Sequence, residues 1–495
     1  MPLPMRIAFI TAECEPWAKT GGLGDVADAL ARSLANVPGA TDGLVDVYMP
    51  RYRSVAVPAG AEPAPPLRVP DRQSLGGAAD VTILDVEANG YRLRLVDHPG
   101  AFDRDGLYGA AGSSDYPDNA WRFGLFCRAA LEAIAADRQR PVDVIHIHDW
   151  HACPAVIFRD RWYADDPVLG RAAAVLTIHN LAYHGWTPRA ALGQLGLAVG
   201  DGVVTDPYGI DLLGAGIDRV EMANTVSPGY ARESLTPELG FGLDGALRTK
   251  GDRYAGILNG LDSAVWDPSS DLDLAATYSA NALGGKALCR ADLLERVGFD
   301  PTDQGPVLGM IGRLDPQKGF DLLADAAPRL LAAGARLVVL GSGDPKIALA
   351  LRALGETRPD RVALLERFDR AMARMIYAGV DFFLMPSRFE PCGQGQMIAL
   401  RYGTPPIVRR TGGLADTVVD EGLFPGEGTG FAFDDATPNA LALACEAAMS
   451  MRDARGTAWD ELVARGMAVD FDWTTGPAPH YVDLFRRAIA IRRGE

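Results

Sequence analysis

The sequence predicts an α/β protein of two domains, each built on a parallel sheet with helices on both faces. The chain has 495 residues, more than one hydrophobic core ordinarily serves, which favours two domains of about 200 to 250 residues. Short apolar runs alternate with helical stretches from end to end, and almost uninterrupted apolar runs are typical of parallel strands buried on both faces. The phrase T-G-G-L also occurs once in each half.

Eight apolar runs mark the predicted parallel strands. They are residues 6–12, 143–148, 174–179 and 222–227 in the first half, and 307–314, 335–341, 381–386 and 405–408 in the second. Two further runs, 81–86 and 91–96, flank E-A-N-G, a sequence typical of a hairpin turn. We therefore expect an antiparallel insertion in the first domain.

A polar, turn-rich stretch, W-D-P-S-S-D-L-D-L (266–274), separates the two sets of strands and is the predicted linker. This places one domain at 1–265 and a second at 266–474. The remaining segment, 475–495, has apolar residues at helical spacing, namely Tyr481, Leu484, Ile489 and Ile491. We expect it to form a helix that packs back on the first domain.

Composition excludes several classes of function. The net charge of -16 argues against nucleic acid or an anionic membrane as the main partner, because both select basic surfaces. No apolar run of about 20 residues and no secretory leader are visible. The six cysteines are scattered without a C-x-x-C pair, which favours a reducing, cytoplasmic location. The sequence gives no prediction of oligomeric state.

The glycine-rich phrase K-T-G-G-L-G-D-V (19–26) follows the first predicted strand, and a helix is expected to begin at or just after its glycines. Backbone N–H groups at Gly21 and Gly22, together with the helix dipole, would favour an anion there. Lys19 would add a full positive charge. The alternative is a plain tight turn at the start of a packed helix.

Two loops of the second half offer groups for a phosphate and a sugar. In G-R-L-D-P-Q-K-G (312–319), Arg313 and Lys318 lie in one short loop and could reach one phosphate group. The alternative is two solvated surface charges.

In P-S-R-F-E-P-C-G-Q-G-Q (386–396), Glu390 follows an apolar strand and could accept hydrogen bonds from sugar hydroxyls. Gly393 and Gly395 would leave backbone N–H groups free for phosphate. The alternative for Glu390 is a helix N-terminal carboxylate that only favours the dipole.

The histidines of H-I-H-D-W-H (146–151) raise the possibility of a metal hydrolase. The chain has only seven histidines and offers no obvious complete ligand set, so we expect no metal site. His179, in H-N-L-A-Y-H-G (179–185), also follows a strand. It is either a cleft residue or a satisfied core histidine.

Seven motifs together are specific, although each alone is weak. They are, in order, K-T-G-G-L-G-D-V, H-D-W-H, T-I-H-N-L-A-Y-H-G, G-I-L-N-G-L-D, G-R-L-D-P-Q-K-G, S-R-F-E-P-C-G and R-R-T-G-G-L-A-D-T-V. With these motifs the chain resembles the bacterial glycogen synthases and plant starch synthases from about residue 6 to about residue 473. The resemblance implies a GT-B glycosyltransferase, with two Rossmann-like domains facing across a deep cleft. It implies transfer of glucose from ADP-glucose to the non-reducing 4-OH of an α-1,4-glucan such as glycogen, with retention, and no cofactor or metal.

The resemblance also implies roles for particular residues. Lys19, Arg313 and Lys318 would hold the donor diphosphate from both domains, and the last two would neutralise the departing ADP. Glu390 would meet the glucosyl hydroxyls, with Cys392 and Gly393 in the same loop. Asp149 and His179 would line the sugar side, Asp25 and Asn259 would touch donor or acceptor, and Phe368 would lie against adenine. The second T-G-G-L phrase is expected to shape the wall near Glu390.

One residue departs from the family pattern. The family usually has a hydroxyl residue where Gly395 stands, so a side-chain hydroxyl contact is lost and the donor preference is less certain than the fold. Two rivals stay open: another GT-B transferase, using a UDP-sugar or forming sucrose, and a non-catalytic two-lobed sugar-binding protein. We expect Lys318→Ala to lower turnover with little loss of fold stability.

Overall fold

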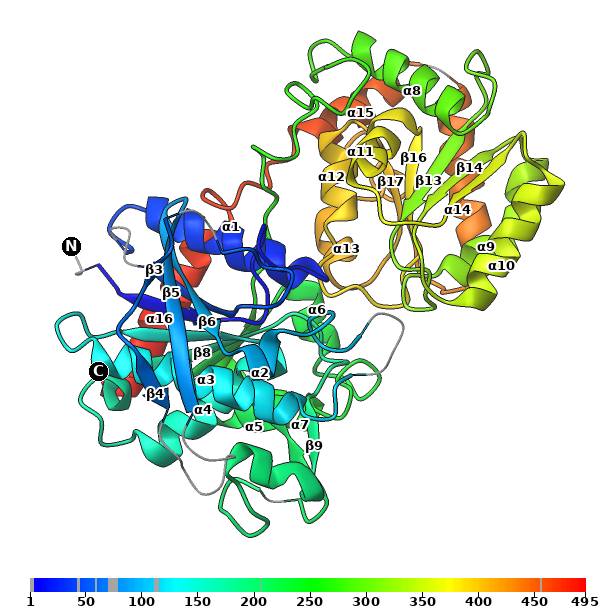
Figure 1. The fold of residues 1–495 in the computed structure, drawn as a ribbon. Helices are drawn as coiled ribbons and strands as arrows, with labels where there is room; N and C mark the ends of the chain where they lie inside the picture. The colour runs from blue at the N-terminus through cyan, green and yellow to red at the C-terminus, as the bar shows by residue number, and fades with distance from the viewer. Residues whose placement is uncertain are drawn as a thin grey trace. The chain divides into compact units, whose positions relative to one another are not determined.

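The computed structural model describes residues 4–41, 45–57, 60–69, 79–110, 115–204, 206–454 and 456–495. The chain divides into two compact units (Figure 1). Unit 1 comprises Met1–Val226, Ala231–Gly260 and Trp473–Glu495, and unit 2 comprises Ser227–Tyr230 and Leu261–Asp472. None of the described helices has both the length and the apolar character needed to cross a bilayer.

Unit 1 is built on a mostly parallel sheet with the strand order β12-β11-β8-β7-β1-β2-β6-β5-β3, and β4 pairs with β5. Its strands are β1 (Ile7–Ile10), β2 (Val45–Pro50), β3 (Glu62–Pro63), β4 (Leu67–Val69), β5 (Ala79–Ala88), β6 (Tyr91–Asp97), β7 (Val144–His148), β8 (Ala173–Ile178), β11 (Met222–Thr225) and β12 (Tyr254–Gly256). The hairpin prediction is confirmed, because β5 and β6 pair antiparallel and Gly90 adopts a positive φ of 89° in the turn. A separate antiparallel pair joins β9 (Trp186–Pro188) and β10 (Gly209–Asp211).

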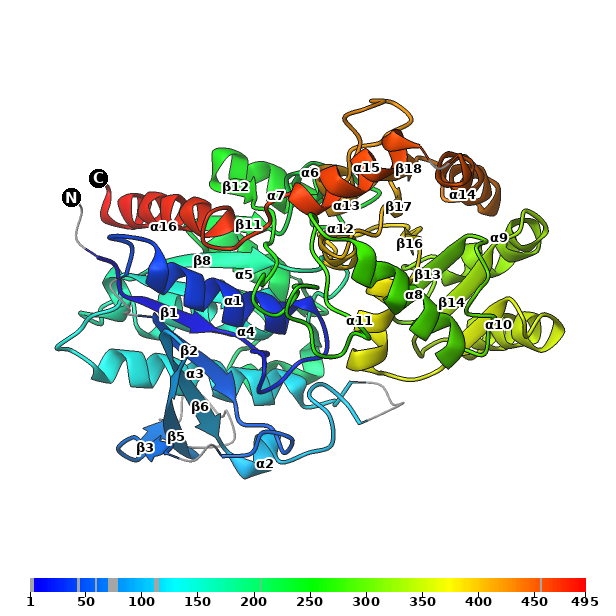
Figure 2. The same cartoon turned by 90° about the horizontal axis from the view of Figure 1, so that it is seen from above.

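Helices cover both faces of this sheet. They are α1 (Gly22–Asn36), α2 (Pro99–Phe102), α3 (Asn119–Ala136), α4 (Asp149–Trp162), α5 (Leu212–Arg219), α7 (Asp244–Lys250) and α16 (Pro477–Arg493), and α6 (Pro228–Glu233) lies where the chain changes units. Figure 2 shows α1 and α16 side by side on one face, with α3 on the other.

The terminal helix α16 is anchored in unit 1 by buried apolar residues and one buried hydrogen bond. Tyr481 and Leu484 are buried, whereas Ile491, which the spacing placed on the apolar face, is exposed. The Tyr481 hydroxyl accepts a hydrogen bond of 3.2 Å from the side-chain amide of Asn224 in β11.

Unit 2 contains a fully parallel sheet with the order β15-β14-β13-β16-β17-β18. Numbered within the unit, this order is 3-2-1-4-5-6, the arrangement of dinucleotide-binding folds. The strands are β13 (Val307–Ile311), β14 (Arg336–Leu340), β15 (Val362–Leu365), β16 (Phe382–Met385), β17 (Pro406–Arg409) and β18 (Phe431–Phe433). The helices are α8 (Gly284–Arg296), α9 (Phe320–Ala332), α10 (Pro345–Thr357), α11 (Arg370–Gly379), α12 (Gly395–Arg401), α13 (Gly412–Thr417), α14 (Pro438–Asp453) and α15 (Thr457–Ala468).

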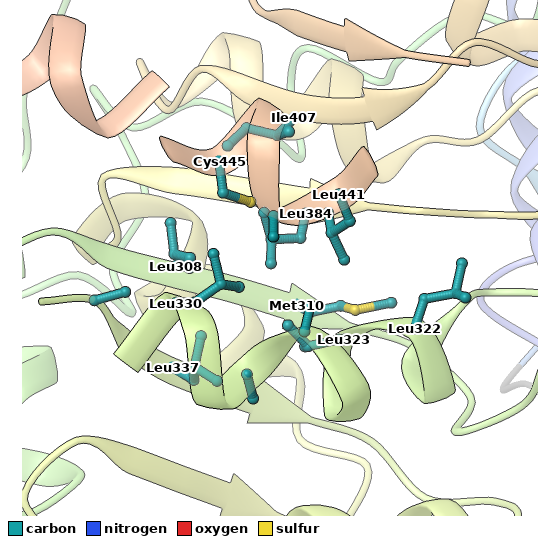
Figure 3. Close-up of a cluster of buried hydrophobic side chains, with 14 of the residues drawn as sticks. Leu308, Met310, Leu322, Leu323, Leu330, Leu337, Leu384, Ile407, Leu441 and Cys445 are labelled. Carbon is teal, nitrogen blue, oxygen red and sulfur yellow. The ribbon is translucent and has the colours of Figure 1, made fainter. Parts of the chain in front are cut away.

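Both faces of the unit 2 sheet are buried, as the continuous apolar runs predict. Leu308 and Met310 of β13 join a cluster with α9 and α14, which includes Leu330 and Cys445 (Figure 3). The alternate residue Val307 belongs to a second cluster with residues of α8 and α11. Successive side chains of a strand point to opposite faces, so an apolar residue is required at every position.

The predicted linker, 266–274, is part of unit 2 and is packed against it. Arg374 of α11 lies 4.6 Å from the ring centroid of Trp266 and donates a 2.8 Å hydrogen bond to Asp271. The Tyr402 hydroxyl donates to the same Asp271 carboxylate at 2.5 Å. This polar stretch is therefore not a free linker, because the sheet unit supplies partners for its charged and aromatic side chains.

Candidate active site

The predicted site residues follow the carboxyl ends of parallel strands in each unit. In unit 1, Lys19 and its glycines follow β1, Asp149 follows β7, His179 follows β8, and Asn259 follows β12. In unit 2, Arg313 and Lys318 follow β13, Phe368 follows β15, and the loop with Glu390 follows β16. Ligands of open α/β sheets bind at this edge.

Lys318 and Glu390 form the central ion pair of the unit 2 site. The Lys318 ammonium donates to both carboxylate oxygens of Glu390, at 2.8 and 2.7 Å, and the Ser387 hydroxyl donates to one of them at 2.9 Å. Glu390 is only 5 % exposed. The Lys318 ammonium, which the sequence predicts to bind a phosphate, therefore lies within hydrogen-bond distance of the Glu390 carboxylate, which it predicts to bind a sugar.

The two loops that carry this pair are fastened together. A Cβ on Gly319, whose φ is 78°, would lie 2.2 Å from the carbonyl oxygen of Pro386, so only glycine fits there. The Arg388 N–H donates to the carbonyl of Gln317 at 2.8 Å, and the Arg388 guanidinium binds Asp321 at 2.7 Å. These contacts fix the Lys318 loop against the Glu390 loop.

Two other unit 2 candidates are exposed at the same edge of the sheet. The Arg313 side chain is largely exposed and lies 3.4 Å from the Asp315 carboxylate. Phe368 is 86 % exposed, which is unusual for a large apolar ring.

The second T-G-G-L phrase packs directly on the Glu390 loop, which confirms its predicted place beside Glu390. A Cβ on Gly412 would lie 2.1 Å from the Glu390 carbonyl oxygen, and a Cβ on Gly413 would lie 2.2 Å from that of Cys392. The Gly413 N–H also donates to the Glu390 carbonyl at 3.1 Å. These glycines allow two backbones to touch. Gly393, in the same loop, has a φ of 76°.

In unit 1 the first phrase begins α1, but two of its backbone N–H groups, those of Thr20 and Gly21, already have an acceptor. The buried carboxylate of Glu13 accepts hydrogen bonds from the Thr20 N–H at 2.6 Å and the Gly21 N–H at 3.2 Å. The Thr20 and Tyr108 hydroxyls also donate to Glu13. Glu13 is not among the residues predicted from the sequence, where its place directly after the first strand run, in T-A-E-C-E-P, is the signal that points to it.

Lys19, Gly21, Gly22 and Asp25 stay at the exposed rim of this loop. The Lys19 ammonium lies 2.5 Å from the Asp25 carboxylate. A Cβ added to Gly21 or Gly22 would meet nothing within 4 Å. The loop thus carries a cation beside open space, and a phosphate would compete with Asp25 for Lys19.

Asp149 and His179 are brought together by the neighbouring strands β7 and β8. The His179 N–H donates to the Asp149 carboxylate at 2.7 Å. Asp149 has a positive φ of 53°, which is costly for a non-glycine residue and is common at functional sites. Burial raises the pKa of Asp149 to about 7, partly offset by hydrogen bonds from the backbone of His179 and Asn180.

The His179 ring stacks on His148 and shares a hydrogen bond with it. The rings are 5.3 Å apart with an interplanar angle of 24°, and His148 Nδ1 lies 3.0 Å from His179 Nε2. Burial lowers the pKa of His179 to about 3, so its imidazole is neutral at physiological pH.

The other histidines of the H-I-H-D-W-H motif are internal. His146 Nε2 shares a hydrogen bond of 2.7 Å with the Thr177 hydroxyl. Burial lowers the pKa of His146 well below its ordinary value. Among the described residues, no three His, Cys, Asp or Glu side chains are grouped as metal ligands. Asn259 is also buried, and its side-chain carbonyl oxygen has no hydrogen-bond partner in the described structure. A buried acceptor of this kind is expected where a ligand supplies the donor.

Comparison with known proteins agrees with this arrangement. Residues 6–249 match the family described as the starch synthase catalytic domain, and residues 305–451 match glycosyl transferases group 1. A glycogen synthase of Anaeromyxobacter dehalogenans (strain 2CP-C) is 44 % identical over 97 % of this chain and 99 % of its own length. A glycogen synthase of Halorhodospira halophila is 42 % identical over 99 % of this chain and all of its own.

A solved structure extends the likeness to three dimensions. The catalytic domain of starch synthase IV from Arabidopsis thaliana, bound to ADP and acarbose, superposes with a TM-score of 0.88 at 31 % identity. The match covers 98 % of this chain and 100 % of that one. The two Rossmann-like units thus have the GT-B fold class, and the chain belongs to the glycogen synthase and starch synthase family of glycosyltransferases.

Proposed function

We propose that the protein transfers glucose from ADP-glucose to the non-reducing 4-OH of an α-1,4-glucan, with retention at the anomeric carbon. The observation that carries this proposal is the Lys318–Glu390 pair at the carboxyl edge of the unit 2 sheet, with exposed Arg313 and Phe368 at the same edge. Cations, a carboxylate and an exposed aromatic ring are the groups that a diphosphate, a sugar and a base require.

In the proposed reaction the bond from glucose C1 to the diphosphate oxygen breaks and a bond from C1 to the acceptor 4-oxygen forms. The proton of the acceptor hydroxyl passes to the departing diphosphate, and ADP carries away the electron pair of the broken bond. Negative charge therefore develops on the diphosphate oxygen, and the fixed cations Arg313 and Lys318 stabilise it most in the transition state. Glu390 accepts hydrogen bonds from glucosyl hydroxyls, and its loop, with Cys392 and Gly393, holds it in place.

Unit 1 supplies the remaining proposed contacts. Lys19 binds the diphosphate after leaving Asp25, and Asp149 and neutral His179 line the sugar side. The unpartnered carbonyl of Asn259 accepts from a donor or acceptor hydroxyl. Because neutral imidazole and amide groups exchange hydrogen bonds with hydroxyls without adding charge, they suit a glucan better than an anion.

We also propose that the enzyme works in the cytoplasm on glycogen. All six cysteines are free and buried, which fits a reducing compartment.

The proposal is tested by measuring glucose incorporation into glycogen, with ADP-glucose and UDP-glucose compared as donors. We expect ADP-glucose to be the better donor. Glu390→Ala should lower kcat on the order of 100-fold, because it removes a fixed contact to the reacting sugar. Glu446→Ala is the matched control, since Glu446 is an ion-paired carboxylate on α14, bound to Arg329 of α9.

Equal activity of wild type and Glu390→Ala would refute the role of Glu390. Faster transfer from UDP-glucose would favour the rival transferase with another donor. Binding of ADP-glucose without any turnover would favour a non-catalytic sugar-binding protein, and loss of activity with chelators would favour a metal enzyme.

A further inference from the structure

Three side chains fill the space that a side chain at position 395 would need. A Cβ on Gly395 would lie 2.9 Å from Phe383 Cε1, 3.3 Å from Met385 Sδ and 3.3 Å from the Tyr377 hydroxyl oxygen. The first distance is shorter than real Cβ atoms show, so a serine or threonine at 395 would displace Phe383. The side chains around position 395 therefore leave room for glycine and not for serine or threonine.

Tyr377 places its hydroxyl group beside Gly395, where a serine or threonine side chain would carry one. The residue lies near the end of α11 and is 5 % exposed. Its ring packs on Phe383, with centroids 4.7 Å apart, and lies edge-on to Trp266 at 6.0 Å. The ring position is thus fixed from two sides, with the hydroxyl beside Gly395.

The Tyr377 hydroxyl has no hydrogen-bond partner among the described residues, and desolvation alone raises the pKa of the phenol well above its ordinary value. A phenol in a packed environment usually finds a hydrogen-bond partner. A neighbouring buried tyrosine of the same unit shows the ordinary case, since the Tyr278 hydroxyl donates to the carbonyl of Tyr402 at 2.8 Å. The Tyr377 hydroxyl is therefore an unused donor next to the Glu390 loop.

We infer that Tyr377 is a donor-binding residue whose hydroxyl donates a hydrogen bond to the diphosphate of the nucleotide sugar, in place of a hydroxyl at position 395. This inference rests on the proposed function. The phenol stays protonated through the physiological range, because its pKa is raised, so it offers a hydrogen to a phosphate oxygen without adding charge. The bond to an anion is of the stronger, charge-assisted kind.

The test is Tyr377→Phe, which keeps the ring and removes only the hydroxyl. We expect the Kd for ADP, measured by calorimetry, and the KM for ADP-glucose to rise about tenfold, because a hydrogen bond to a charged group is lost. The melting temperature should not fall, since the hydroxyl has no protein partner. Tyr278→Phe is the matched control and should lower the melting temperature while leaving the Kd for ADP unchanged.

A rescue variant separates a hydroxyl contact from simple packing. Phe383→Leu makes room at position 395, and Gly395→Ser then returns a hydroxyl to it. In the Tyr377→Phe background these two changes together should restore at least half of the lost ADP affinity, whereas Phe383→Leu alone should not.

The outcomes separate this inference from the proposed function. If wild type transfers glucose from ADP-glucose and Tyr377→Phe binds ADP as tightly as wild type, the inference is overturned and the function stands. An equal loss of affinity in Tyr377→Phe and Tyr278→Phe would show a structural role and also overturn it. If wild type neither binds ADP nor transfers glucose, the proposed function fails, and the inference fails with it.

Discussion

At the scale of single residues, Lys318 and Glu390 are less independent than the sequence indicates. The motifs assign one to phosphate and the other to sugar, but the ammonium lies 2.7 Å from a carboxylate oxygen whose residue is 5 % exposed. Removing the cation leaves a buried carboxylate with the Ser387 hydroxyl as its remaining side-chain donor among the described residues. The expectation that Lys318→Ala changes turnover with little loss of stability therefore needs revision.

We now predict that Lys318→Ala lowers both kcat and the free energy of unfolding, the latter by about 1 to 3 kcal/mol. The double variant Lys318→Ala with Glu390→Gln should recover most of that stability, because the amide carries no charge. Denaturant unfolding of wild type, the two single variants Lys318→Ala and Glu390→Gln, and the double variant gives the coupling energy. Equal stability of wild type and Lys318→Ala would show that solvent, rather than Lys318, compensates the carboxylate.

Asp149 gives the second prediction at this scale. Burial raises the pKa of Asp149 from 3.8 in the unfolded chain to about 7 in the folded one, so folding favours the protonated form. The unfolded state loses its proton first, and this contribution to stability is lost as the pH rises between about 4 and 7. Wild type should therefore lose about 2 kcal/mol between pH 5 and pH 7 relative to Asp149→Asn, which cannot titrate.

The measurement is denaturant unfolding of both proteins at the two pH values. Asp483→Asn, on the exposed face of α16, is the control and should follow wild type at both pH values. A constant difference between wild type and Asp149→Asn across this range would contradict the raised pKa.

At the scale of elements, the two T-G-G-L phrases begin helices in the same way but perform different tasks. The first begins α1 with open space around Gly21, and the second begins α13 with Gly413 pressed on the Cys392 carbonyl. Each phrase follows a parallel strand, β1 or β17, as a strand-to-helix turn of such a fold requires. The repeated sequence forms the same kind of strand-to-helix turn in both units. The two turns differ in function because different segments pack against their glycines.

This difference predicts losses of stability of different size for the same substitution at the two phrases. Gly413→Ala should lower the free energy of unfolding by at least about 2 kcal/mol, because its Cβ would lie 2.2 Å from a backbone oxygen that cannot rotate away. Gly21→Ala should change it by less than about 1 kcal/mol, since a Cβ there meets nothing. Thermal unfolding of both variants against wild type is the measurement. Similar losses in the two would mean that the loops do not differ in packing.

At the scale of the whole molecule, the chain begins and ends in the same unit. After forming unit 2, it returns at Trp473, and α16 lies beside α1 and β8 (Figure 2). Phe485 of this helix is fully buried and contacts the ring of His146 in β7, with centroids 5.2 Å apart. The buried face of α16 is therefore part of the unit 1 core.

We predict that Phe485→Ala lowers the stability of unit 1 by about 3 to 5 kcal/mol, the usual loss for an aromatic ring removed from a core. Arg486→Ala, at the adjacent exposed position, should be close to neutral. Hydrogen exchange resolved by segment should show the loss in unit 1 and leave unit 2 protected. Equal loosening of both units would contradict an independent core for each.

The strands were predictable where burial on both faces leaves an uninterrupted apolar run, as at 307–314. The strand β2 was missed because Asp46 interrupts its run of V-D-V-Y-M-P. That buried carboxylate is bound by Arg6, just before β1, and by Arg92 of β6, at 2.9 and 2.7 Å. Local pattern cannot indicate a buried charge whose partners are 40 and 46 residues away.

By itself the sequence determined the strand-and-helix alternation, the hairpin and the loops that carry the site, since these depend on periodicity, turn residues and motif spacing over a few residues. Tertiary structure alone decided that Lys318 pairs with Glu390, that Glu13 takes the N–H groups of the first glycine loop, and that Tyr377 lies beside Gly395. Each of these is a contact between segments brought together by the order of strands in a sheet. The strand order depends on how whole elements pack against one another, so it cannot be predicted from any short stretch of sequence.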